Sequence, residues 1–343
     1  MGRHIRSTFA GLGYETFVLA RPTPDSFDLP RFVDSTDVWD QQGVTAASGY
    51  DIPLEEYTAW AEENAIDVAF FDQNYQFDHI AKLRSKGIKT IGRFVWESFS
   101  EKHVEEAKRA FDIVYSLTKC EQIRYAGFGI DSPRVQWGCR PELTAICPEK
   151  PTDGIYFYYP GGYLSKRKPT KVVIQAFTQV ESPHIKLIVK VQTPQRQADS
   201  IGDLKALDSR IRVITADLPV HEHYNLFASC HVCLAPSRWE GLGIHLYEAS
   251  AFGMPTITND NPPMNEVVRN QYNGLLVNSH QIGYTVSGVP SFEPDVADLS
   301  RAIGTLSEYE MIDKLSTNAR KMRKTLSWEK TTADFENLIN YVL

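Results

Sequence analysis

Several features that define broad protein classes are scarce or missing in this sequence. Five cysteines among 343 residues are too few, and odd in number, for a disulfide framework, and they favour a reducing compartment. No stretch reaches the roughly 18 uncharged apolar residues of a membrane-spanning helix. With 36 basic and 43 acidic residues the net charge is −7, which argues against a nucleic-acid partner bound through general basic charge. These observations predict an acidic cytoplasmic protein, and a length of 343 residues corresponds to about two domains.

Specific chemical motifs are missing as well. No G-x-G-x-x-G follows an apolar strand, which argues against a nicotinamide-dependent oxidoreductase. No acidic cluster has D-x-D character, so we expect neither a catalytic metal nor another cofactor. Cys230 and Cys233 form a single C-x-x-C, which offers too few ligands for structural zinc, and we expect both in the core. Residues 1–17 lack the apolar stretch of a secretory signal.

Short apolar runs alternate with amphipathic stretches along both halves of the chain. The expected strands are Phe17–Ala20, Val68–Phe71, Thr90–Val95, Ile113–Tyr115, Ile155–Tyr159, Ile185–Val191, Ile211–Thr215, Val232–Ala235 and Thr256–Thr258. The expected helices are Leu54–Asn64, Ser100–Ala110, Lys171–Val180, Val220–Ala228, Ile244–Phe252 and Asp295–Leu306. This alternation indicates parallel sheets covered by helices on both faces. Residues 141–154 hold three prolines and have the composition of a linker, so we expect two α/β lobes with a ligand cleft between them.

Residues 235–260 (APSRWEGLGIHLYEASAFGMPTITND) carry the clearest chemical pattern. An expected strand ends at Ala235, a glycine-containing loop follows, and a helix begins near Ile244. Backbone N–H groups and the dipole at such a helix start bind anions, usually phosphate. Glu240 on the loop and Glu248 in the helix suit the acceptance of hydrogen bonds from sugar hydroxyls. An anion site between two such carboxylates predicts a ligand composed of a sugar, a diphosphate and a ribose.

This segment resembles the E-x7-E region of the retaining glycosyltransferases of GT-B fold (glycosyltransferase group 1, family 4-like), which use nucleotide-diphosphate sugars. The matching residues are Pro236-Ser237-Arg238, Glu240-Gly241, Gly243, Glu248-Ala249, Gly253-x-Pro255, Glu266-Val267-Val268, Asn273-Gly274-Leu275-Leu276-Val277 and Ser327-Trp328-Glu329. The resemblance extends from about residue 155 to residue 343.

The resemblance implies an α/β protein of GT-B fold, in which two Rossmann-like domains face each other across a cleft. We expect an N-terminal acceptor-side domain at 1–145, a linker at 146–154 and a nucleotide-sugar-binding domain at 155–326. A C-terminal helix in 327–343 is expected to pack back toward the N-terminal domain. The first strand of the family is missing from the expected pattern, since residues 1–6 (MGRHIR) correspond to the end of the loop that follows that strand.

The resemblance also implies roles for particular residues. Glu240 contacts the hydroxyls of the donor sugar, and Glu248 holds the ribose hydroxyls. The diphosphate and the nucleotide base are bound largely through backbone groups. These donor-binding positions are Gly243, Ile244 and His245 for the diphosphate, and Ala216 and Leu218 for the base, with Gly241 as a further residue of the donor site.

A basic turn, residues 161–169 (GGYLSKRKP), follows the strand that begins at Ile155. The family has an Arg and a Lys here that bind the leaving diphosphate. Lys168 falls on the Lys position, but Tyr163 falls on the Arg position, so either Lys166 or Arg167 substitutes or the alignment shifts. Gly162 belongs to the same donor-binding turn. At least one cation is required because negative charge develops on the leaving group. The alternative is a basic turn that is merely solvated.

The N-terminal lobe offers fewer signals. Glu97, after Trp96 at a strand end, occupies the place where the family often has a His, and it either orients a hydroxyl or simply faces solvent. Residues 81–93 contain five basic side chains. They could face a phosphorylated lipid acceptor or an anionic membrane surface, but we favour a solvated helix end and turn.

The prediction is a metal-independent, retaining glycosyltransferase. It would move a sugar from a nucleotide-diphosphate sugar to a hydroxyl of a saccharide, lipid-linked or small-molecule acceptor, with Glu240, Lys168 and Glu97 as catalytic residues. Two alternatives stay open. One is a sugar-nucleotide-binding protein without transferase activity, which the missing first strand, Tyr163 in place of Arg and the missing His favour. The other is a sugar-nucleotide epimerase of similar fold, for which Glu97 is the visible acid/base candidate in the N-terminal lobe.

Overall fold

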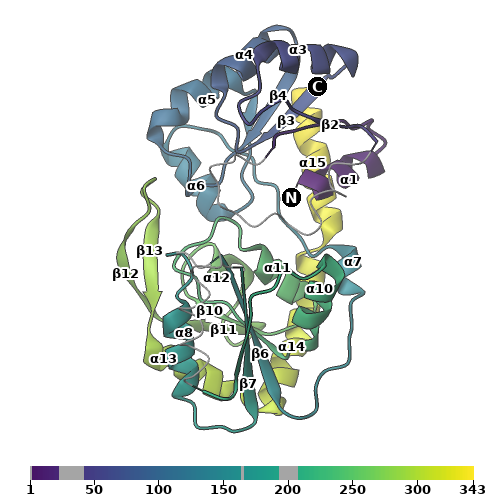
Figure 1. The fold of residues 1–343 in the computed structure, drawn as a ribbon. Helices are drawn as coiled ribbons and strands as arrows, with labels where there is room; N and C mark the ends of the chain where they lie inside the picture. Colours follow the sequence, from purple (N-terminus) through teal and green to yellow (C-terminus); the bar gives the residue numbers. More distant parts are fainter. Residues whose placement is uncertain (1, 23–41, 164–165, 193–207) are drawn as a thin grey trace. The chain divides into compact units, whose positions relative to one another are not determined.

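A computed structural model describes residues 2–22, 42–163, 166–192 and 208–343 of the protein (Figure 1). The chain forms two compact units. Unit 1 contains Met1–Gln136 and Glu329–Leu343, and unit 2 contains Trp137–Trp328. The chain therefore returns to unit 1 with its last helix, α15 (Trp328–Val342), and the proline-containing stretch 141–154 belongs to unit 2.

Unit 2 is built on a six-stranded parallel sheet. Its strands are β6 (Ile155–Tyr163), β7 (Ile185–Gln192), β8 (Ile211–Ile214), β9 (Val232–Leu234), β10 (Thr256–Asn259) and β11 (Gly274–Val277). Their order in the sheet is β11-β10-β9-β6-β7-β8, and all neighbours are parallel. The order reverses between β6 and β9. In doubly wound sheets of this kind, ligands bind at the carboxyl ends of the strands beside that reversal.

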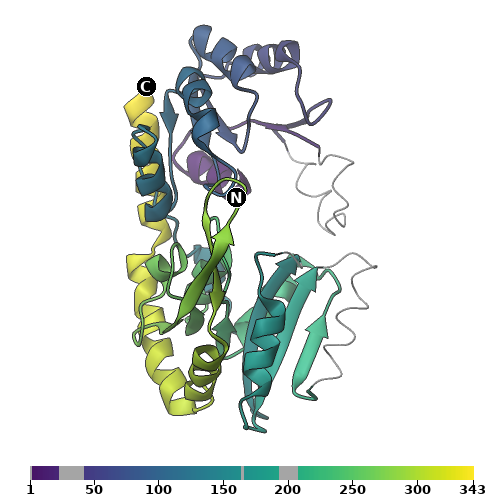
Figure 2. The same cartoon turned by 90° about the vertical axis from the view of Figure 1, so that its left-hand side faces the viewer.

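Helices cover both faces of this sheet (Figures 1 and 2). Phe157 of β6 packs edge-on against Phe177 of α8 (Thr170–Thr178), with ring centroids 6.1 Å apart. The next residue, Tyr158, stacks on Phe227 of α10 (Val220–Ser229) at 4.3 Å. Because successive side chains of a strand point to opposite faces, both must be apolar here, which explains the uninterrupted apolar run of β6.

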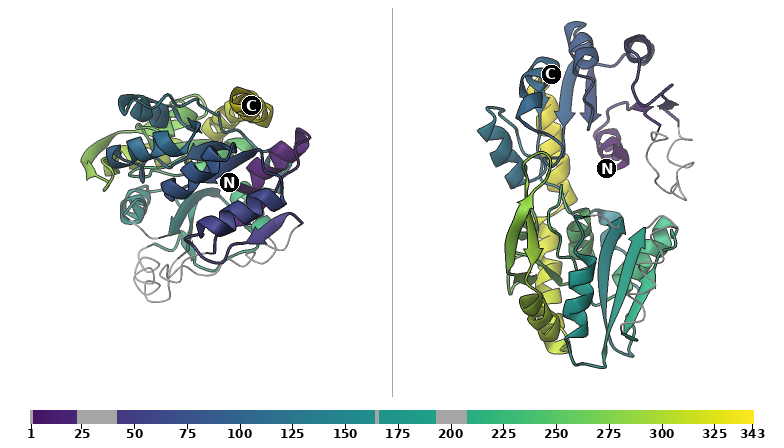
Figure 3. Two further views of the ribbon diagram at one scale, coloured as in Figure 1. Left: turned by 90° about the horizontal axis from the view of Figure 1, so that it is seen from above. Right: turned by 60° about the vertical axis from the view of Figure 1, so that its left-hand side comes forward.

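The other helices in the described part of unit 2 complete these layers. They are α7 (Pro141–Thr144), α11 (Ile244–Ala251), α12 (Met264–Val267), α13 (Val296–Thr305) and α14 (Tyr309–Thr325). A hairpin of β12 (Ser279–Tyr284) and β13 (Pro290–Pro294) forms an antiparallel ribbon apart from the six-stranded sheet (Figure 3). Arg238 attaches this hairpin to the loop after β9, since its side chain pairs with Glu293 and its carbonyl accepts a hydrogen bond from Phe292 N at 2.9 Å.

Unit 1 contains two small parallel sheets. One is β1 (Val18–Ala20) with β2 (Val44–Ala46), and the other is β3 (Val68–Asp72), β4 (Lys89–Arg93) and β5 (Ile113–Val114). The described residues of this unit form, besides α15, helices α1 (Gly2–Gly11), α3 (Leu54–Glu63), α4 (Phe77–Ser85), α5 (Val104–Ala110) and α6 (Lys119–Gly127), with a 3-10 turn at Glu101–His103.

One expectation for unit 1 is wrong. The first six residues were expected to end a loop, but they lie in helix α1 from Gly2 onward. The ring of Phe9 explains the helix, because it packs 4.8 Å from Phe70 of β3 and 5.5 Å from Phe335 of α15. The basic stretch 81–93 covers the end of α4, the turn after it and β4. Lys82 and Lys86 are exposed, as favoured, but Arg93 is 3% exposed and lies 3.1 Å from Asp72. Among the described residues, no helix has the length and apolarity needed to cross a membrane.

Candidate functional site

The loops after β6 and β9 bring one carboxylate and two cations together. Lys168 Nζ lies 2.6 Å from Oε1 of Glu240 and 2.9 Å from Oγ of Ser237. Nη1 of Arg167 lies 3.7 Å from the other carboxylate oxygen of Glu240. The side chains of Lys168 and Glu240 are 9% and 7% exposed, respectively. The cluster therefore forms at the reversal of strand order, where this kind of sheet binds ligands.

The charges of this cluster determine the protonation of Glu240. Burial alone would favour the neutral acid, but the neighbouring charges, Lys168 foremost, outweigh burial and lower the pKa of Glu240 to about 2. Glu240 is thus ionised at neutral pH. A lysine ammonium has three N–H donors, and within the described part of the chain Lys168 uses two of them, on Ser237 and Glu240. The third donor can serve a ligand oxygen.

Backbone contacts fix the two loops to each other. The backbone N–H of Arg238 donates to the carbonyl of Arg167 at 2.9 Å, and its Nη1 donates to the carbonyl of Lys166 at 2.6 Å. Asn259 at the end of β10 donates to the carbonyl of the fully buried Ser237 at 3.0 Å. Ser237 lies in the predicted motif, but its contact with Lys168 was not predicted. The cluster is therefore held by the loop backbone as well as by its own ion pairs.

Helix α11 begins at the same edge of the sheet. Its N-cap residue Gly243 has φ +72°, and a Cβ there would lie 2.9 Å from Leu246 Cδ1. Gly243 has no side chain to cap the first turn, and among the described residues no side chain accepts a hydrogen bond from the backbone N–H of Ile244 or His245. Glycine adopts this positive φ without strain, and the resulting turn suits a phosphate.

The His245 side chain lies close to the same charges. Its Nε2 is buried and has no hydrogen-bond partner among the described residues. Burial, with the nearby Lys168, lowers the pKa of His245 to about 3, so the imidazole is neutral at physiological pH. The other predicted residues of α11 and its loop are Gly241, which is buried, and Ile244, which is 40% exposed.

Three further predicted donor residues lie at or after the carboxyl ends of strands that share this edge. Gly162 lies near the end of β6 with φ +53°, next to a bulge in its pairing with β7. Ala216 and Leu218 follow β8, where Ala216 is exposed and Leu218 half-buried. Between them, Asp217 accepts a hydrogen bond from Gln192 of β7 at 3.0 Å, which ties this loop to the neighbouring strand.

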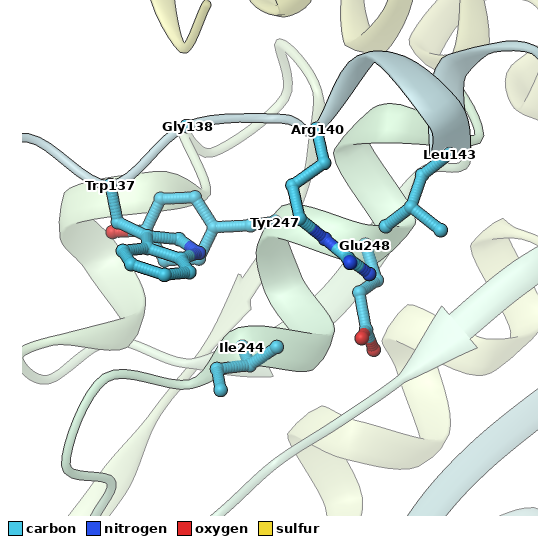
Figure 4. A pocket seen from close by; sticks show the side chains of 7 residues that line it. All are labelled: Trp137, Gly138, Arg140, Leu143, Ile244, Tyr247 and Glu248. Atoms are coloured by element: carbon cyan, nitrogen blue, oxygen red, sulfur yellow. The ribbon is translucent and has the colours of Figure 1, made fainter. Parts of the chain in front are cut away.

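Glu248 lies on α11 with two partners that the sequence analysis missed. Tyr224 of α10 donates its hydroxyl to Oε1 of Glu248 at 3.3 Å, and Arg140 Nη2 donates to that hydroxyl at 2.8 Å. Burial raises the pKa of Glu248, and Arg140 and Tyr224 oppose this rise. Arg140 and Glu248 line one small pocket (Figure 4). The remaining residues of that pocket are Trp137, Gly138, Leu143, Ile244 and Tyr247.

Glu97 belongs to unit 1, in the turn that follows β4. It is half-buried, and its neighbour Trp96 donates a backbone hydrogen bond to the buried carboxylate of Glu121. Glu121 also caps the start of α6 together with Thr118. The turn is thus anchored by a capping carboxylate, while the catalytic role of Glu97 stays a prediction.

Comparison with known proteins identifies the family. A model of the family "Glycosyl transferases group 1" matches residues 148–322, about half of the chain. The chain belongs to this family. The match covers both loops of the cluster and helix α11, and it confirms the resemblance drawn from the motifs.

Two curated relatives match shorter segments. The putative glycosyltransferase YtcC of Bacillus subtilis is 30% identical over 110 residues, which are 32% of this chain and 24% of that protein. An uncharacterized protein from the cps region of Klebsiella pneumoniae is 40% identical over 52 residues, which are 15% of this chain and 14% of that protein. The chain therefore matches at most a quarter of the length of these relatives.

Solved structures resemble the chain over much more of its length. Sucrose-phosphate synthase from Thermosynechococcus elongatus has a TM-score of 0.74 at 16% identity, covering 99% of this chain and 92% of that one. A glycosyltransferase from Rickettsia africae has a TM-score of 0.73 at 11% identity, covering 98% and 93%. Anabaena HepE, solved with UDP and glucose, has a TM-score of 0.66 at 15% identity, covering 84% and 81%. These likenesses confirm the predicted α/β GT-B fold.

Proposed function

We propose that the protein is a glycosyltransferase that moves a sugar from a nucleoside-diphosphate sugar to a hydroxyl acceptor, without a metal ion and with retention at the anomeric carbon. The observation that carries this proposal is the buried, ionised Glu240, paired with Lys168 and Arg167 beside the start of α11. Family membership supports it, as does the fold shared with HepE, which was solved with UDP and with UDP-glucose.

Each part of the donor has a matching chemical group in unit 2. The first backbone N–H groups of α11 and the third donor of Lys168 suit the diphosphate. The carboxylate of Glu240 suits the hydroxyls of the sugar, and that of Glu248 suits the ribose hydroxyls. The loop with Ala216 and Leu218 would lie against the base. With the diphosphate, the ribose and the base bound in this way, the sugar would lie next to Glu240.

The reaction needs charge stabilisation more than a protein nucleophile. The bond between the anomeric carbon and the diphosphate oxygen breaks, and negative charge develops on that oxygen. Lys168, Arg167 and the helix dipole stabilise this charge, which is why we propose that no metal is required. The acceptor oxygen then bonds to the anomeric carbon on the same face, and its proton passes to the leaving phosphate oxygen. Glu97 would orient a hydroxyl of the acceptor or of the donor.

Replacement of the central carboxylate tests this assignment. Glu240→Gln keeps the shape of the side chain but removes its charge, so sugar transfer should fall about 100-fold. Donors would be the UDP, GDP and ADP conjugates of common hexoses, and released nucleoside diphosphate would report turnover. The matched control is Glu222→Gln on α10, whose carboxylate is largely exposed and should have no effect. Near wild-type turnover by a folded Glu240→Gln protein would contradict the proposal.

A further inference from the structure

Three side chains from separate segments of unit 2 form a directed chain of hydrogen bonds. Arg140 Nη2 donates to the hydroxyl of Tyr224 at 2.8 Å, and that hydroxyl donates to Oε1 of Glu248 at 3.3 Å. Arg140 precedes α7, Tyr224 lies on α10, and Glu248 lies on α11. Because an arginine only donates and a carboxylate only accepts, the tyrosine hydroxyl has one arrangement that satisfies both partners.

The Arg140 end of this chain is fixed in place. Arg140 is 7% exposed, and its Nη1 donates to Glu142 at 3.0 Å. The preceding residue, Cys139, donates its backbone N–H to Leu326 at 2.6 Å and its thiol to the Tyr247 carbonyl at 3.5 Å. The segment is thus tied both to α11 and to the residues before α15. A guanidinium held in this way can orient the groups that it contacts.

Glu248 keeps one oxygen available in this arrangement. Oε1 accepts from Tyr224, whereas no hydrogen bond to Oε2 is found within the described residues. The carboxylate lines the pocket of Figure 4 together with Arg140, which enters it from another segment. The last side-chain torsion of a glutamate adopts a broad range of angles, so a hydrogen-bond partner on Oε1 restricts the direction in which Oε2 points.

We propose that Arg140 and Tyr224 are positioning residues, which through the hydrogen bond to Oε1 orient the Glu248 carboxylate toward the ribose hydroxyls of the donor nucleotide. This inference rests on the proposed function, because it takes a nucleoside diphosphate as the ligand of Glu248. An oriented carboxylate binds hydroxyls more tightly because less side-chain freedom is lost on binding. The chain of hydrogen bonds from Arg140 through Tyr224 to Glu248, here called the relay, therefore contributes to the preference for ribose and not to recognition of the diphosphate.

Tyr224→Phe tests the inference with a change of one hydroxyl. The ring contacts of Tyr224 with His223 at 5.5 Å and Phe252 at 6.3 Å would remain. Affinities for UDP, GDP and ADP and for their 2′,3′-dideoxy counterparts would be measured by calorimetry. We expect about tenfold weaker binding of the ribonucleotide and unchanged binding of the dideoxy counterpart, so that the ratio of the two affinities falls. Arg140→Lys should lower the ratio less, because it keeps a donor near Tyr224.

Tyr156→Phe is the matched control. Tyr156 also accepts from a cation, Lys186 at 3.1 Å, and donates to a carboxylate, Asp153 at 3.1 Å, but it follows the start of β6 on the exposed side of the unit. This control should leave the ratio unchanged. In a Glu248→Ala background, Tyr224→Phe should have no further effect on the ratio, because the relay acts through Glu248.

The outcomes separate this inference from the proposed function. If the wild type binds none of the three nucleoside diphosphates, both are wrong. If it binds one of them but does not prefer ribose, the assignment of Glu248 to the ribose hydroxyls is wrong, and so is the positioning role of Arg140 and Tyr224. If it prefers ribose and Tyr224→Phe keeps the ratio, or weakens both nucleotides equally, the relay alone is overturned.

Discussion

Lys168→Met should destabilise unit 2, because it leaves the buried carboxylate of Glu240 without its closest cation. Lys168 and Glu240 are both nearly buried, and their polar atoms lie 2.6 Å apart. The cations around Glu240 lower its pKa from 4.5 to about 2, which corresponds to about 3 kcal/mol of stabilisation at neutral pH. Removing one partner of a buried ion pair typically costs about 3 to 5 kcal/mol, because the other charge is left unpaired. We therefore expect a loss of about 3 kcal/mol at pH 7.

The pH dependence of this loss has a defined sign. A carboxyl whose folded-state pKa is lowered stabilises the fold above its unfolded pKa, here near 4.5, and loses that contribution as pH falls toward about 2. The difference between wild type and Lys168→Met should accordingly be full at pH 7 and shrink below pH 4.5. Urea unfolding curves recorded at both ends of this range measure it.

A double-mutant cycle provides the control and the refutation. Lys168→Met combined with Glu240→Gln should cost clearly less than the sum of the two single changes, because no unpaired charge remains. Lys186→Met, which removes the partner of the exposed Asp153, should have little effect on stability, because solvent screens this pair. Additive effects in the cycle, or a Lys168→Met protein as stable as wild type, would refute the proposed coupling.

Three smaller predictions concern α11. Gly243→Ala should cost about 1 to 2 kcal/mol, since φ is +72° and the Leu246 side chain would have to shift. Gly304→Ala in α13, with nothing within 4 Å, should stabilise by about 0.5 to 1 kcal/mol, and thermal unfolding compares the two variants. Because burial raises the pKa of Glu248, calorimetric nucleotide affinity should start to fall at a pH above 4.5, and Glu248→Gln should lack this fall. Since the pKa of His245 is about 3, transfer rates of His245→Gln should follow the wild-type pH profile between about pH 5 and 8.

The strands of unit 2 could be predicted because burial on both faces leaves an uninterrupted apolar run. β7 and β10 begin at the expected residues, Ile185 and Thr256. β6 continues beyond the expected Tyr159 to Tyr163, because Gly162 and Tyr163 pair with β7 across a bulge that the residue pattern does not reveal. Helix α14 was not predicted, although four of its buried residues have helical spacing. They are Ile312, Leu315, Ala319 and Met322.

The site was only partly predictable for a different reason. Lys168, Glu240 and Glu248 lie in or near motifs, and the family pattern identifies them without their partners. Arg140 and Tyr224 are 84 residues apart, and they meet because of the order of elements in unit 2. No local pattern marks such a pair. The structure was therefore needed to show that Glu240 is held by cations and that Glu248 is held by a relay.

Nucleotide binding by the wild-type protein is the most direct test of the donor site formed by Lys168, Glu240 and the start of α11. UDP, GDP and ADP would be titrated calorimetrically, each with and without magnesium. We expect that one of them binds without magnesium and that Lys168→Met weakens this binding at least tenfold. Absence of binding by all three, or binding that depends on magnesium, would contradict the donor site assigned to Lys168, Glu240 and the start of α11.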